Sequence, residues 1–161
     1  MNQRAAIKND ILISIQPEYA DQIMDGCKTV ELRRRFVETV EQDTRLFIYS
    51  SSPVGAIIGC AKIEGVIKLP IKQIWKTFHK QACIAKSEFE KYFDGVEFGF
   101  VVSLGDVTPL TELLVREDIL DRWGIRPPQS YMYLPLEIAA SIFDGINEVS
   151  ARHKYHLRHR R

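Results

Sequence analysis

The stretch Gly26–Arg35, with the sequence GCKTVELRRR, constrains the fold most, because it marks a change from a helical to an extended pattern. Upstream, Pro17 suits the first turn of a helix, and apolar residues at positions 20, 23 and 24 form a stripe along it. Gly26 is expected to end that helix. From Thr29 onward apolar and polar residues alternate, which predicts a strand with one polar face.

The polar face of this strand brings opposite charges together. Glu31 and Arg33 are two residues apart, so their long side chains can pair, and Lys28 at the turn can swing toward the same face. A carboxylate between two cations stays ionised and holds both of them in place. The alternative is a solvated edge strand with a weak surface ion pair.

The remaining pattern predicts an α+β protein. Buried or alternating strands are expected at 11–15, 28–35, 45–50, 56–67, around 98–102 and at 131–133. Helices are expected at 17–25, 69–82, 87–92 and 136–143, with a helical turn at 109–114. Ser87 is the predicted cap of the third helix. Gly59 is the predicted bend of the long strand, where it curves around a small barrel.

Length and hydropathy indicate a single cytoplasmic domain. We expect an N-terminal tail at 1–10, one domain at 11–144 and a basic C-terminal tail at 145–161. No apolar run approaches the ~20 residues that span a bilayer, and the first residues do not form an apolar signal region. The oligomeric state is left open.

Neither a metal nor a cofactor is expected. Cys27, Cys60 and Cys83 are odd in number and widely separated, which suits neither a disulfide framework nor a zinc site, although Cys27 could be reactive. The histidines at 153, 156 and 159 are spaced along one helix but have no acidic or cysteine partner.

The charge distribution excludes a generally basic nucleic-acid-binding surface. The formal net charge is +1, yet residues 152–161 carry five cations and no acid, which leaves −4 for the rest of the chain. Any attraction to phosphates must therefore come from a local group such as Arg33, Arg34 and Arg35, or from the tail.

The pattern Gly26-x-Lys28-x-x-Glu31-x-Arg33 resembles the signature GxKxxExR of the ASCH domain family, a member of the PUA-like group of small β-barrels. All four signature positions match, and the resemblance extends from about Ile11 to about Val107. The later Pro127-Pro128-Gln129-Ser130-Tyr131 is similar to an extension found in longer relatives. The resemblance implies a PUA-like barrel with peripheral helices.

It also implies a module associated with RNA, whose cleft holds Lys28, Glu31 and Arg33 as candidate catalytic residues. The expected partner is single-stranded RNA or a modified nucleoside or nucleotide, with aromatic faces that stack on a base. The candidate ligand-binding residues are Thr29, Tyr49, Ser51, Ser130 and Tyr131.

Whether the protein turns over a substrate is left open. One branch of the family hydrolyses N4-acetylcytidine with a lysine, a threonine nucleophile and a glutamate, but here Glu31 occupies the position of that threonine. Another branch is a ribonuclease, for which Glu31 or a lysine would be the base and Arg33 or Lys28 the electrophile. A binding or regulatory module needs no turnover.

Overall fold

The computed structural model describes residues 9–145, which form one curved sheet with helices at its ends. The expected tails lie largely outside the described residues, as do His153, His156 and His159, so the domain boundaries stay a prediction. The strands are β1 (Ile11–Ile15), β2 (Val30–Arg33), β3 (Arg45–Ser50), β4 (Ala56–Pro70), β5 (Phe98–Val115) and β6 (Tyr131–Tyr133). The helices are α1 (Pro17–Met24), α2 (Ile71–Ala82), α3 (Lys86–Tyr92), α4 (Arg116–Trp123) and a further helix at 136–145.

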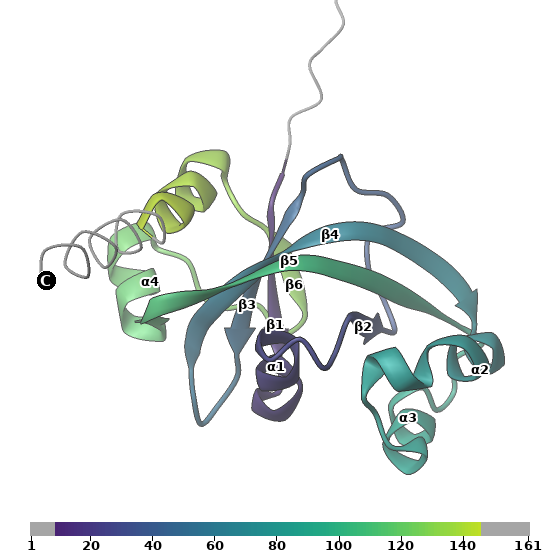
Figure 1. Cartoon of the computed structure of the whole chain (residues 1–161). Helices are drawn as coiled ribbons and strands as arrows, with labels where there is room; N and C mark the ends of the chain where they lie inside the picture. The colour runs from purple at the N-terminus through teal and green to yellow at the C-terminus, as the bar shows by residue number, and fades with distance from the viewer. Residues whose placement is uncertain (1–8, 146–161) are drawn as a thin grey trace, which may run out of the picture.

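The six strands follow the order β2-β5-β4-β3-β1-β6, with β1 parallel to β3 and the other neighbours antiparallel. The sheet curls into a half-barrel, and its two edge strands, β2 and β6, are not paired with each other. Figure 1 shows α2 and α3 together at one end, α4 and the helix 136–145 at the other, and α1 between them. The expected small α+β barrel with peripheral helices is confirmed.

The sheet bends at Gly59. The register of β4 shifts beside this residue against both β3 and β5. A Cβ atom at Gly59 would lie 2.7 Å from the backbone oxygen of Thr108 and 2.6 Å from the sulfur of Met24. Glycine therefore lets β5 and α1 approach the strand at its bend.

Three apolar clusters fix the helices on the sheet. The first packs α1 on β1 and β3 and includes Ile13 and Ile48; the second packs α4 and the helix 136–145 on the other face and includes Phe47 and Ile119. The third lies under α2 and α3 and contains both apolar residues of β2, Val30 and Leu32. None of the helices in the described part of the chain is long and apolar enough to cross a membrane.

Two expectations about local structure are wrong, and one helix was missed. Residues 109–114 belong to β5, because Pro109 lies opposite Gly59 at the register shift, where a missing N–H is tolerated. The helix α4 was not predicted, although two acids in its first turn and Gly124 at its C-terminal end, with φ +66°, are signals for it. Ser87 does not cap α3, whose N-cap residue is Ala85.

Candidate functional site

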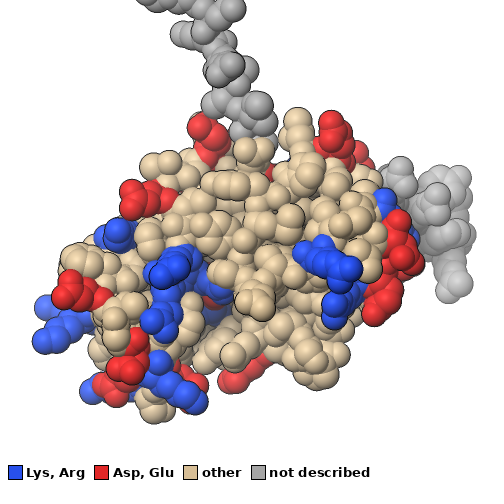
Figure 2. Space-filling view, turned by 180° about the vertical axis from the view of Figure 1, so that it is seen from behind, with Lys and Arg blue, Asp and Glu red and all other residues tan. Residues whose placement is uncertain are grey.

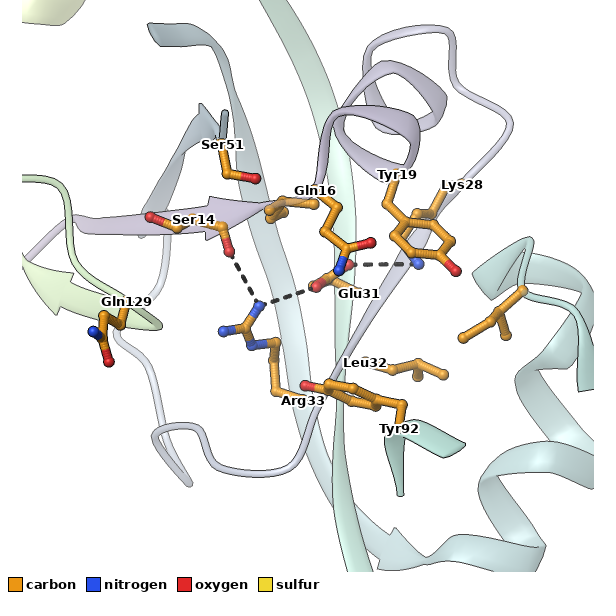
Figure 3. A pocket seen from close by; sticks show the side chains of 12 residues that line it. Ser14, Gln16, Tyr19, Lys28, Glu31, Leu32, Arg33, Ser51, Tyr92 and Gln129 are labelled. Carbon is orange, nitrogen blue, oxygen red and sulfur yellow. Dashed lines mark hydrogen bonds and ion pairs between the residues drawn. The ribbon is translucent and has the colours of Figure 1, made fainter. Parts of the chain in front are cut away.

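A cavity of about 290 Å³ opens between β2 and the carboxyl end of β1, where the half-barrel is not closed by backbone pairing. Its walls come from β1, α1, β2, the turn after β3, and the segments around α3 (Figure 3). It is lined by Ser14, Ile15, Gln16, Tyr19, Lys28, Glu31, Leu32, Arg33, Ser51, Ile84, Tyr92 and Gln129.

The local fold explains why the charged residues face this cavity. Gly26 adopts φ +79° after α1, and the backbone N–H of Lys28 then donates to the carbonyl oxygen of Gln22 at 3.0 Å. Val30 and Leu32 pack under α2 and α3, so the alternating residues of β2 point the other way. Glu31 and Arg33, on the predicted polar face of this strand, therefore form part of the cavity wall.

Lys28, Glu31 and Arg33 form a continuous chain of charges. Lys28 Nζ lies 3.5 Å from Glu31 Oε2, and Arg33 Nη1 lies 3.4 Å from Glu31 Oε1. Lys28 Nζ also donates to the carbonyl oxygen of Ala82 at 2.8 Å. The side chains are only 3%, 8% and 13% exposed, so this is no surface ion pair. The three groups together carry one excess positive charge toward the cavity.

Arg33 joins the two edges of the sheet. Its Nη1 donates to the carbonyl oxygen of Ser14 at 3.3 Å, and its Nη2 donates to Ser130 Oγ at 2.8 Å. Ser14 also binds the segment that carries Ser130, because its Oγ donates to the carbonyl oxygen of Pro128 at 2.5 Å. In Figure 3 the guanidinium of Arg33 lies between Ser14 and Glu31, and Lys28 lies on the far side of Glu31, beside the ring of Tyr19.

Two tyrosines that sequence reasoning missed supply aromatic surface. Lys28 Nζ lies 5.2 Å from the centre of the Tyr19 ring, and the backbone N–H of Arg34 donates to the Tyr92 hydroxyl at 3.3 Å. Burial raises the pKa of both hydroxyls, so they stay protonated near neutral pH. Tyr19 could have been found from its place on the helix that leads into the signature. No local pattern marks Tyr92.

The predicted ligand-binding residues divide into two groups. Ser51 lines the cavity and Ser130 bonds to Arg33, while the ring of Tyr131 packs against that of Phe36 in a tilted arrangement, with ring centres 4.8 Å apart. Thr29 is exposed and is not among the lining residues, and Tyr49 is buried on the opposite face of the sheet with the α4 cluster. Their roles in binding stay predictions.

A second hollow of about 290 Å³ adjoins the first and shares Arg33 and Tyr92 with it. It is lined by Arg33, Arg34, Arg35, Tyr92 and Ser130. Figure 2 shows one face of the molecule, on which separated groups of Lys and Arg alternate with Asp and Glu. On this face positive charge is confined to local groups, which agrees with the charge distribution of the sequence. Among residues 9–145 there is no cluster of three or more His, Cys, Asp or Glu that could hold a metal ion.

Comparison with known proteins places this geometry in a family. A family model described as a domain of unknown function, DUF365, matches residues 9–121. An "ASCH domain-containing ribonuclease" of Zymomonas mobilis is 30% identical over 130 residues, which cover 81% of this chain and 87% of that protein. The chain belongs to the ASCH domain family.

Solved structures agree with this assignment. The crystal structure of ASCH from Zymomonas mobilis matches this ASCH domain with a TM-score of 0.79 and 28% identity, covering 85% of this chain and 95% of that one. Variants of the same protein with a tyrosine replaced by phenylalanine, or a serine by alanine, also match with a TM-score of 0.79. The N-terminal domain of Staphylothermus marinus McrB, at 12% identity and a TM-score of 0.54, shares the fold alone. The expected ASCH fold, an α+β barrel of the PUA-like type, is confirmed.

Proposed function

We propose that this ASCH domain binds single-stranded RNA. One unpaired base would lie in the first cavity, here called the seam cavity, which Tyr19 and Glu31 line, and the neighbouring phosphates in the second, here called the arginine hollow, which Arg33, Arg34 and Arg35 line. The observation that carries the proposal is that the seam cavity and the arginine hollow adjoin. The seam cavity offers aromatic and polar groups, the arginine hollow offers three arginines, and Arg33 and Tyr92 line both. A nucleotide needs this combination of a base site and a phosphate site at adjacent positions.

The arginine hollow suits phosphate for a chemical reason. A guanidinium presents a planar fork of N–H donors that matches two phosphate oxygens. Arg34 and Arg35 are exposed, and neither forms an ion pair with an acid in the described part of the chain. Both guanidinium groups can therefore contact phosphate without first breaking a salt bridge.

The seam cavity suits an unpaired base. The Tyr19 and Tyr92 rings provide apolar surface, while Gln16, Ser51 and Gln129 can donate to or accept from the edge of a base. Its volume of about 290 Å³ is near the lower end of the range for small-molecule sites, which favours one base over a paired helix.

The relative's name supports RNA cleavage as the activity at this site. Cleavage needs a base for the 2′-hydroxyl proton and a cation near the phosphorane, roles that we assign to Glu31 and Arg33. The tyrosine and serine substituted in the Zymomonas variants are separated along their chain by the same number of residues as Tyr49 and Ser130. Ser130 orients the Arg33 guanidinium, whereas Tyr49 packs behind the sheet and would act on the site only through β3.

Two other functions find less support. An amidohydrolase needs a hydroxyl nucleophile beside Lys28, but among the described residues this ammonium contacts Ala82, Glu31 and the Tyr19 ring. A protein-interaction module would expose apolar residues on the helices between 70 and 94. The large apolar residues that are exposed in the described structure lie at 54, 67, 98, 113, 115, 133 and 136.

Fluorescence anisotropy with labelled single-stranded RNA, duplex RNA and single-stranded DNA tests the proposal, with denaturing gels run on the same mixtures to detect cleavage. We expect tightest binding to single-stranded RNA. Replacing Arg34 and Arg35 with Ala should weaken it and reduce the salt slope by about two. Arg122 and Arg126, replaced together, are the matched control, because both are exposed and lie on or just after α4. Equal losses in the two double variants would refute the assignment of the hollow.

A further inference from the structure

Cys27 and Cys83 lie opposite each other on two segments that run side by side. The backbone N–H of Thr29 donates to the carbonyl oxygen of Gln81 at 3.0 Å, and Lys28 Nζ reaches Ala82. One step further along, Cys83 Sγ lies 3.0 Å from the carbonyl oxygen of Cys27. Residues 29, 28 and 27 of one segment thus contact residues 81, 82 and 83 of the other. The two segments are therefore antiparallel, and the two cysteines lie across from each other.

Both residues are accessible to small molecules. Cys27 is exposed and Cys83 is partly exposed, whereas Cys60 lies buried within β4, and burial raises the pKa of its thiol to about 11. Cys83 ends α2 in a left-handed conformation with φ +50°, and Cys27 follows Gly26, whose φ is +79°. Both thiols therefore sit on turns outside the ladders of the sheet, where small backbone shifts break no strand pairing.

We propose that Cys27 and Cys83 form a reversible disulfide that links the start of β2 to the end of α2. A low-molecular-weight disulfide such as oxidised glutathione is the oxidant. The exposed Cys27 thiolate attacks one of its sulfur atoms and releases one glutathione thiolate. The Cys83 thiolate then attacks the Cys27 sulfur of the mixed disulfide and releases the second. The protein loses two protons and two electrons, and two molecules of reduced glutathione form.

The link would act on the walls of the cavity. Cys27 directly precedes Lys28, and Cys83 lies between Ala82, which accepts from Lys28, and Ile84, which lines the cavity. A covalent bond between the two turns fixes the separation of these walls. The oxidation state of the pair thereby sets how far Lys28 and Ile84 can move apart.

The test uses the full chain equilibrated in buffers of reduced and oxidised glutathione, quenched with acid, alkylated and digested. Mass spectrometry should find a peptide pair joined at Cys27 and Cys83 in the oxidised sample, and alkylated Cys60 in every sample. The oxidised protein should melt about 5–10 °C higher, because the bond closes a long loop, and added dithiothreitol should reverse the shift.

Three variants separate the possible outcomes. Cys27→Ser and Cys83→Ser should each abolish the linked peptide and the shift in melting temperature, while Cys60→Ser should leave both unchanged. A stable glutathione adduct on Cys27 without an internal link, a link that involves Cys60, or a link between two chains would each overturn the proposal. It does not depend on RNA binding, so its failure leaves the proposed function untouched.

Discussion

The Arg33 guanidinium spans the open seam of the half-barrel and donates a 2.8 Å hydrogen bond to Ser130 Oγ, 97 residues further along the chain. The same guanidinium contacts the carboxylate of Glu31 and the carbonyl oxygen of Ser14. A residue of the ASCH signature thus connects β2 to the segment that precedes β6. The signature and the Pro127–Tyr131 segment build one site.

Ser130→Ala should weaken binding of single-stranded RNA about three- to tenfold, because the guanidinium loses one of the partners that orient it. We expect the free energy of unfolding to fall by about 1–2 kcal/mol. Anisotropy and urea titration measure the two quantities. Ser141→Ala, at an exposed position on the helix 136–145, is the control. Unchanged RNA affinity in the Ser130 variant would show that Arg33 is held by its other contacts alone.

Glu31→Gln separates turnover from binding. The amide keeps the shape of the side chain, and its single oxygen can still accept from either Lys28 or Arg33, but its NH2 group is a donor and it cannot take a proton. If Glu31 is the general base, cleavage should fall by about 100-fold or more while RNA affinity changes less than about threefold. Single-turnover cleavage on gels and isothermal titration provide the two numbers. Equal losses in both would assign the carboxylate a purely positioning role.

Gly59→Ala should destabilise the domain by about 2–3 kcal/mol, because the new methyl group would overlap the backbone oxygen of Thr108. Gly65→Ala is the matched control on the same strand, since no atom lies within 4 Å of its Cβ position. Urea unfolding of the two variants measures the difference. Equal stabilities would mean that β5 can move away from the bend at little cost.

Cys60 should contribute to loss of stability in alkali. Burial raises the pKa of its thiol from 9.0 to about 11, so the folded state holds this proton more tightly than the unfolded state does. The resulting stability is complete below pH 9 and is lost as the pH rises through about 11. Between pH 8 and 11 the wild type should lose about 2 kcal/mol more than Cys60→Ala, measured by urea unfolding at each pH. Parallel losses in both proteins would contradict this.

The sequence predicted elements whose pattern is set locally. Pro17 and Gly26 bound α1 as expected, and the alternation of Val30 and Leu32 with Glu31 and Arg33 gave the correct faces of β2. The prediction at 109–114 was wrong because a proline is compatible both with the first turn of a helix and with a register shift in a strand. Pro109 lies opposite Gly59 on the neighbouring strand, and this long-range contact decides for the strand.

The charged part of the site was predictable because it lies within one segment. Lys28, Glu31 and Arg33 follow from spacing on β2 and the turn before it, and of the residues predicted on other segments Ser51 and Ser130 also lie at the site. The places of Tyr92 and Gln16, and the contact of Cys83 with the backbone of Cys27, depend on how α3, the end of β1 and α2 meet around the seam. Those contacts join residues far apart in the chain, so local periodicity carries no information about them.

Because β2 and β6 are not paired, the width of the gap between these two edge strands can change. In a sheet closed by backbone hydrogen bonds, widening the barrel would require breaking a ladder. Here the gap is bridged by the side chain of Arg33, which reaches the carbonyl oxygen of Ser14 and the hydroxyl of Ser130, so rotamer changes at Arg33 and Ser130 can alter its width while every strand keeps its partners. Tolerance for ligands of different size can therefore evolve at these positions without any change to the architecture of the sheet.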